Sequence, residues 1–387
     1  MGDLLRLILR NSSRNKVRTL LTVAGTAVAV IAFGFLQTVL AAYNIGVEAA
    51  SPSRLVTRHR VSLFNLLPYA YGEKIASISG VTQVSWGNWF GAYYKDPQQF
   101  FGQLAVDDRY MGLYPEFILP ADQKEAYNAE LQAAVVGRKL ANRFGWKIGD
   151  RITLMGSPYT QAEGWDFIIR GIYHGRERIT DETTMFFHWK LLNERLGGDF
   201  NQVGWYLIGI DKPEETGTIT AAVDDLFFNS SAPTLTENEK AFNQSFVSMM
   251  GSIITIIKVA AWIVIGIILL IMTNTMGMSS RERTSEYGIL KTLGYRAGHL
   301  LALITGESIF VTVAGALVGC LIAYGLVSVI GVGIEEQMGQ IFPVFELTSS
   351  TVLFALIMAI VVGIIAGVPP SLRAMRMPIA DALRRVG

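Results

Sequence analysis

The run VAAWIVIGIILLIMTNTMGMSS, residues 259–280, contains 22 residues and no Asp, Glu, Lys or Arg. As a helix it rises about 33 Å, which exceeds the roughly 30 Å hydrocarbon core of a bilayer. Residues 19–47, 300–334 (interrupted only by Glu307) and 347–372 show the same depletion of charge. Buried helices of a soluble protein are the weaker alternative, because they rarely run so long without a charge. The sequence therefore predicts four membrane-spanning helices.

The overall composition agrees with a membrane protein. The chain has 387 residues, of which 51% are hydrophobic and 17% charged, whereas soluble proteins have about a quarter charged residues. A cleaved signal peptide is an alternative for the first run, because basic residues precede it. That run is much longer than the roughly 7–15 apolar residues of a signal peptide. The only cysteine, Cys320, lies in the third run, so we expect no disulfide.

Basic residues predict the orientation in the membrane. The N-terminal segment, the segment after the second run and the C-terminal tail together hold 13 Lys and Arg against four acidic residues. The short loop at 332–346 has three Glu and no Lys or Arg. We therefore expect a multi-pass protein of the cytoplasmic (inner) membrane with both termini in the cytoplasm and its large domain in the periplasm.

These patterns divide the chain into segments. The N-terminal one is either an amphipathic helix on the inner leaflet or a disordered basic tail. The expected segments are a cytoplasmic amphipathic helix at 1–18, transmembrane helices at 19–42, 250–280 (extending into the periplasm), 300–331 and 347–370, a periplasmic domain at 43–247, a cytoplasmic helix at 281–299, a short periplasmic loop at 332–346 and a cytoplasmic tail at 371–387.

The periplasmic domain is predicted to be α+β. Near each end, at residues 71–86 and 203–238, strand and helix patterns indicate a β-α-β-like unit. Between them, at about 105–200, short strands and turns indicate a β-rich insertion. The aromatic residues Trp86, Trp89, Phe90, Tyr93 and Tyr94 are either a binding face or core, and core is favoured. The domain has 19 basic and 24 acidic residues, which argues against a nucleic-acid partner.

Enzyme motifs are missing from the 387 residues. The four histidines are scattered, and neither a nucleophile elbow nor a G-x-x-x-x-G-K-[ST] phosphate loop occurs. We therefore expect no catalytic residue, no metal site and no cofactor bound by this chain. Glu307 is the one ionisable residue inside a span. It is either a proton-relay member or, as we favour, a residue with a structural hydrogen bond or an interfacial role.

Pairs of glycines four residues apart predict close helix packing. Gly315 and Gly319 lie in the third run, and Gly363 and Gly367 lie in the fourth. Such pairs let helix backbones approach one another, either within one protomer or across a dimer.

The charged segment RERTSEYGILKTLGYRAG, residues 281–298, lies between the second and third runs. Ile289, Leu290 and Leu293 fall on one flank of a short helix, and Gly294 is placed to end it. A helix with an apolar flank and surrounding charges can rest on lipid, serve only as a positive-inside loop, or dock into a groove of a partner.

Within this segment, SEYGILKTLGYR resembles the cytoplasmic coupling segment of the MacB/FtsX-like permeases, the membrane subunits of mechanotransmission-type ABC transporters. Glu307 and the glycine-rich run that follows are similar to the third span of that family. VVGRKLANRFGWKIGDRITL (135–154) and PPSLRAMRMPIADALR (369–384) resemble its outer domain and its Pro-rich exit from the fourth span. The family pattern E-x-G-x-L-K-x-L-G is matched by Glu286, Gly288, Leu290, Lys291, Leu293 and Gly294.

The resemblance implies an α-helical membrane protein with four transmembrane helices and a large extracytoplasmic domain of porter-like β-α-β units with a β-rich insertion. It also implies a set of residues that contact an ATPase, which itself binds ATP and Mg. These are Glu286, Tyr287, Gly288, Ile289, Leu290, Lys291, Leu293 and Gly294. Because 18 residues precede the first span, we expect that ATPase to be a separate subunit.

The same resemblance implies a second permease copy or paralogue as partner, membrane lipid around the spans, and a possible periplasmic adaptor or outer-membrane channel. We expect export or extraction of a lipid, lipoprotein, peptide or drug-like substrate. The alternative function is regulation of an extracellular cell-wall hydrolase.

Overall fold

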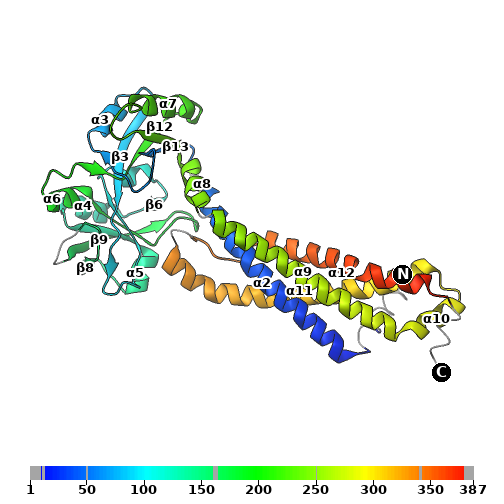
Figure 1. The fold of residues 1–387 in the computed structure, drawn as a ribbon. Coiled ribbons are helices and arrows are strands. Elements are labelled where there is room, and N and C mark those ends of the chain that lie inside the picture. Colours follow the sequence, from blue (N-terminus) through cyan, green and yellow to red (C-terminus); the bar gives the residue numbers. More distant parts are fainter. Residues whose placement is uncertain are drawn as a thin grey trace. The chain divides into compact units, whose positions relative to one another are not determined.

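The chain forms two compact units in a computed structural model that describes residues 10, 14–48, 51–159, 164–249, 251–339 and 342–378 (Figure 1). The sheet domain comprises Ala42–Met250 and Gly331–Val344. The helical unit comprises Met1–Ala41, Gly251–Ile330 and Phe345–Gly387.

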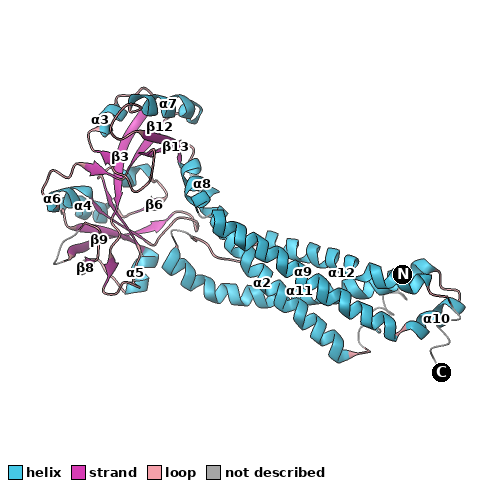
Figure 2. Ribbon diagram, in the orientation of Figure 1, coloured by secondary structure: helices cyan, strands magenta, loops and turns pink. Residues whose placement is uncertain are grey.

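One mixed sheet organises the sheet domain (Figure 2), and in the described residues it has eleven strands. Its path is β13 (Thr234–Asn238), β1 (Arg54–His59), β12 (Trp205–Ile210), β3 (Val81–Trp89), β5 (Gly102–Val106), β10 (Thr184–His188), β7 (Ala133–Gly137), β9 (Trp165–Gly175), β8 (Arg151–Met155) and β4 (Tyr93–Tyr94), with β6 (Phe117–Ile118) paired to β9. A small second sheet pairs β2 (Leu67–Pro68) with β11 (Gln202–Val203).

The two predicted β-α-β-like units interleave at one end of this sheet. β1 lies between β12 and β13 and is antiparallel to both, and β12 also pairs with β3. Helix α3 (Tyr71–Ala76) precedes β3, and α7 (Thr216–Leu226) connects β12 to β13. The strands of the expected insertion continue the same sheet, because β5 pairs with β3 through Gly87↔Val106 and Trp89↔Leu104. The insertion is therefore not a separate domain.

Both faces of the sheet are covered. Adjacent residues of β1 point to opposite faces, so Leu55 packs into one hydrophobic cluster and Val56 into the other. Trp86 and Phe90 are buried in the larger cluster, whereas Trp89 is 41% exposed. The remaining helices of the domain are α4 (Ala121–Ala129), α5 (Arg138–Phe144), α6 (Trp189–Arg195), α8 (Glu239–Met249) and the 3-10 turns at Tyr110–Leu113 and Pro213–Glu215.

The helical unit contains long apolar helices. In the described part of the chain, four helices are long and apolar enough to cross a membrane. These are α2 (Lys16–Glu48), α9 (Gly251–Glu282), α11 (Ala297–Met338) and α12 (Ser349–Arg376). Phe33, Met272, Ala316 and Ala359, one from each helix, belong to a shared buried cluster. The predicted fold class, four apolar helices with a large α/β domain, is confirmed.

Several helix bounds differ from the expected segments; α2, for example, extends beyond the expected 19–42 at both ends. α11 runs to Met338, so the first part of the predicted loop at 332–346 is helical, which suits the strong helix formers Glu335 and Glu336. α12 continues through Pro369 and Pro370 to Arg376, so the helix extends past the expected end at residue 370 and both prolines lie inside it.

Parts of the predicted segments lie outside the described residues. These are most of the N-terminal helix at 1–18, the junction between α8 and α9 at residue 250, and the tail from 379 onward.

Candidate functional site

The charged segment between α9 and α11 folds as a short helix with defined ends. α10 (Thr284–Thr292) begins after Arg283, whose φ of −99° and ψ of 16° interrupt the helical path from α9. At the other end Gly294 has a φ of +87°. The Gly294 N–H donates to the Lys291 carbonyl at 3.1 Å, and the Tyr295 N–H donates to the Leu290 carbonyl at 3.1 Å. This is the Schellman arrangement, which a glycine at the left-handed position favours.

One face of α10 is buried inside the helical unit. Tyr287 is 3% exposed and packs with Leu300 and Ile304 of α11 and Ala374 of α12. Leu290 packs against the same cluster, and Gly288 is buried beside it. Burial raises the pKa of the Tyr287 phenol, because the phenolate would lose its hydration there. This face anchors the helix.

The opposite face of α10 and the turn after it are apolar and exposed. Ile289 is 49% exposed, Leu293 71% and Tyr295 40%. We call these three residues the ridge. Water-exposed apolar side chains in such a group are typical of an interaction site.

The acidic residues of this region are neutralised by arginines of the same chain. Glu286 pairs with Arg14 at 2.5 Å, and Glu282 pairs with Arg18 at 2.6 Å. Four other exposed guanidinium groups of this unit have no partner among the described side chains. These belong to Arg281, Arg296, Arg373 and Arg376. The segment that carries the ridge and the end of α12 therefore present unpaired positive charge.

Two further contacts involve charged side chains of this segment. The Arg283 guanidinium contacts the Glu307 carboxylate of α11 at 3.0 Å. The Lys291 ammonium group donates hydrogen bonds to the carbonyl oxygens of Met375 and Met377. Glu307, the predicted intramembrane carboxylate, thus has a cationic partner from the segment itself.

The eight predicted ATPase-contacting residues divide into two groups. Ile289 and Leu293 lie on the ridge, and Gly294 forms the exposed turn. Tyr287, Gly288, Leu290 and Lys291 face the apolar helices or bond to them, and Glu286 pairs with Arg14 in the segment before α2. The prediction that Leu290 shares one flank with Ile289 and Leu293 is wrong, because Leu290 packs against the buried cluster whereas the other two side chains are exposed. Successive residues of a helix are about 100° apart, so neighbours such as Ile289 and Leu290 can differ in burial.

The four predicted packing glycines lie at helix contacts within this chain. A Cβ on Gly315 would lie 2.6 Å from the Thr26 Cβ of α2, and one on Gly319 would lie 2.8 Å from the Ala27 carbonyl oxygen. Likewise a Cβ on Gly363 would lie 2.8 Å from the Ile309 Cα of α11, and one on Gly367 would lie 2.8 Å from the Thr305 Cα. The glycines therefore bring α11 close to α2 and α12 close to α11.

A buried ion network in the sheet domain was not predicted. Arg54, at the start of β1, contacts Glu116 at 2.6 Å and Glu239 at 2.8 Å, and its guanidinium lies 4.3 Å from the centre of the Tyr114 ring. Burial lowers the pKa of Arg54, but the hydrogen bond with Glu116 and the Glu239 charge outweigh it and raise the pKa overall. The three partners are far apart in sequence, so no local pattern could have revealed the network.

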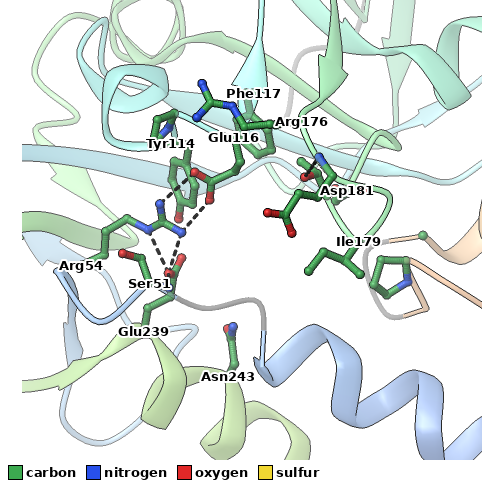
Figure 3. Close-up of a pocket in the computed structure, with 15 residues that line it drawn as sticks. Ser51, Arg54, Tyr114, Glu116, Phe117, Arg176, Ile179, Asp181, Glu239 and Asn243 are labelled. Carbon is green, nitrogen blue, oxygen red and sulfur yellow. Dashed lines mark hydrogen bonds and ion pairs between the residues drawn. The ribbon is translucent and has the colours of Figure 1, made fainter.

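This network borders a cavity of about 400 Å³. Figure 3 shows Arg54 between Glu116 and Glu239 on one side of the cavity, with Ile179 and Asp181 on the other. Ser51, which follows α2, and Asn243 of α8 also line it, as do Gly339 and Pro343 between α11 and α12. The described residues contain no group of three or more His, Cys, Asp or Glu that could hold a metal ion.

Comparisons with known proteins agree with the permease resemblance. Residues 258–379 match the family model described as FtsX-like permease C-terminal. The ABC transporter permease YvrN of Bacillus subtilis, itself uncharacterised, is 33% identical over 151 residues, covering 39% of this chain and 33% of that protein. The uncharacterised ABC transporter permease MJ1507 of Methanocaldococcus jannaschii is 22% identical over 408 residues, covering 99% of this chain and 98% of that protein.

A crystal structure of the periplasmic region of MacB from Actinobacillus actinomycetemcomitans also matches. It has a TM-score of 0.39 and 9% sequence identity, covering 52% of this chain and 95% of that one.

Proposed function

Because the chain carries an FtsX-like permease domain and is similar to ABC transporter permeases, we propose that ATP hydrolysis on a partner ATPase moves α10. In this proposal the motion passes through the apolar helices to the sheet domain on the other side of the membrane. There it drives export or extraction of a lipid, lipoprotein, peptide or drug-like substrate. ATP and Mg bind to the ATPase.

The observation that carries this proposal is the exposed ridge of Ile289, Leu293 and Tyr295 at the C-terminal end of a helix whose other face is anchored. An apolar anchor is what a helix presents to a groove. The segment that carries the ridge also holds the unpaired Arg281 and Arg296, so the groove that fits it best is apolar with an acidic rim. Lipid is the weaker occupant, because the ridge stands on a firmly held helix that presents only one short apolar strip.

The orientation follows from the same proposal. The ATPase works where ATP is available, so α10 and the ridge lie in the cytoplasm and the sheet domain lies outside. A second permease copy completes the transporter, and a periplasmic adaptor or an outer-membrane channel can join it there.

A pull-down from the native membrane in mild detergent, followed by mass spectrometry, tests the proposal. We expect the tagged chain to bring down an ATPase with a phosphate loop, and Leu293→Asp to lose it. Leu226→Asp is the matched control, because Leu226 is 50% exposed on α7 of the sheet domain; this variant should retain the ATPase. Failure to recover any ATPase with the unaltered chain would overturn the proposal. Recovery of a wall hydrolase in place of transport partners would favour the regulatory function.

A further inference from the structure

Lys291 reaches the carboxyl end of the fourth apolar helix. Its Nζ lies 2.9 Å from the carbonyl oxygen of Met375 and 2.7 Å from that of Met377. Met375 is in the last turn of α12, and Met377 is the residue that follows the helix. Of the described side chains of α10, Lys291 is the one that hydrogen-bonds to α12.

The carboxyl end of a helix is a favourable place for this ammonium group. The last four carbonyl groups of a helix lack partners within the helix, and they carry a partial negative charge. Lys291 donates to one carbonyl in the last turn and to another just beyond it, which uses two of its three N–H groups. The half-buried ammonium group is thereby committed to α12 and is a poor candidate for contact with a partner.

The other links of the segment lead to different helices. The backbone joins α10 to α9 and α11, and the ion pair of Glu286 with Arg14 joins it to the segment that leads into α2. Among the described residues, the buried cluster around Tyr287 adds apolar contact with the small side chain of Ala374 of α12. The lysine is therefore the polar connection between α10 and α12.

We infer that Lys291 is a positioning residue that makes α12 move together with α10. This inference rests on the proposed function, in which a partner displaces α10. It assigns the lysine of the E-x-G-x-L-K-x-L-G pattern to the transmission of motion inside the permease, whereas the ridge residues make the contact with the ATPase.

The test measures the distance between α10 and α12 in the full chain with its co-purified ATPase. Spin labels are placed at Thr292→Cys and Leu372→Cys, both exposed, with Cys320→Ser removing the native thiol. With Lys291 present, we expect one narrow distance distribution that ATP does not change. Lys291→Met keeps the length of the stem but removes the charge, so the distribution should broaden and become dependent on ATP.

Two control variants sharpen the comparison. Lys291→Arg retains a cation, so its distance distribution should stay narrow. Lys124→Met removes an exposed cation from α4 of the sheet domain, and the distance distribution of this variant should match that of the unaltered chain. In Lys291→Met, amide exchange in the last turn of α12 should accelerate about fivefold, as expected for the loss of about one net hydrogen bond.

The outcomes separate this inference from the proposed function. Co-purification of the ATPase with Lys291→Met, together with a distance that now depends on ATP, supports the link. A narrow, ATP-independent distance in Lys291→Met overturns it. If the unaltered chain recovers no ATPase, the proposed function fails. The width of the distance distribution in Lys291→Met without nucleotide still shows whether the lysine keeps α12 at a fixed distance from α10.

Discussion

Arg283 and Glu307 form an ion pair at the point where the chain turns from α9 into α10. The closest guanidinium nitrogen and carboxylate oxygen are 3.0 Å apart, and the two side chains are 11% and 9% exposed. Arg283 is the residue that interrupts the helix, and Glu307 lies on α11. The pair therefore ties the turn before α10 to the third apolar helix.

Removing one member of this pair should destabilise the helical unit. Breaking a buried pair leaves an unpaired charge and costs about 3–5 kcal/mol, so Glu307→Ala and Arg283→Ala should both lower the SDS concentration at which helicity is lost. In a double-mutant cycle followed by circular dichroism, the coupling energy should be about 1–3 kcal/mol. Additive effects of the two substitutions would show that the pair contributes nothing.

An exposed pair provides the control for this cycle. Arg18 and Glu282 also join two helices, but their side chains are 25% and 56% exposed. Their coupling energy should be below about 1 kcal/mol and should fall as salt is added.

Two glycines of α11 should respond in opposite ways to the same substitution. A Cβ on Gly315 would overlap Thr26, whereas a Cβ on Gly325 would meet nothing within 4 Å. Gly315→Ala should destabilise the helical unit by about 1–3 kcal/mol, because the packed helices must separate. Gly325→Ala should be neutral or stabilise it by up to about 1 kcal/mol through helix propensity. SDS titration measures both, and equal effects would contradict close packing between α2 and α11.

Much of the helical unit could be predicted from the sequence. The absence of charge over 259–280 and the other runs identified the apolar helices, because a membrane excludes ionised side chains. Gly294 was expected to end α10, and its positive φ confirms this. The family resemblance drawn from the segment around Gly288 is confirmed by the FtsX-like match over residues 258–379.

The tertiary contacts could not be predicted from one sequence. Lys291 bonds to carbonyl groups some 80 residues away, and carbonyl groups are present at every residue, so no pattern marks them. Glu282 and Glu286 each pair with an arginine of the N-terminal segment, which no local spacing in the sequence indicates. The continuity of the sheet from β3 to β5 depends on strand pairing, which local periodicity does not encode.

The Arg54 network should dominate the stability of the sheet domain. Arg54→Met would leave Glu116 and Glu239 without their shared cation in a largely buried site, at a cost of about 3–5 kcal/mol. Tryptophan fluorescence can follow the unfolding, because six of the seven tryptophans lie in this domain. Arg109→Met is the control: its partner is Asp107 and its side chain is 58% exposed, so its effect should stay below about 1 kcal/mol. An equal shift of the unfolding midpoint in both variants would show that Arg54 contributes no more to the stability of the domain than the exposed Arg109.

Accessibility to a membrane-impermeant maleimide should place α10 and the sheet domain on opposite sides of the membrane. Thr292 of α10 and Asn229 of the sheet domain are both exposed, so each can be replaced by cysteine in a Cys320→Ser chain. In intact spheroplasts we expect Asn229→Cys to react and Thr292→Cys to be protected, because the basic residues around α10 favour the cytoplasm. Lysis should make both react at similar rates, which controls for local burial. Reaction of Thr292→Cys in intact spheroplasts would put the ridge on the side without ATP and contradict its role as the ATPase contact.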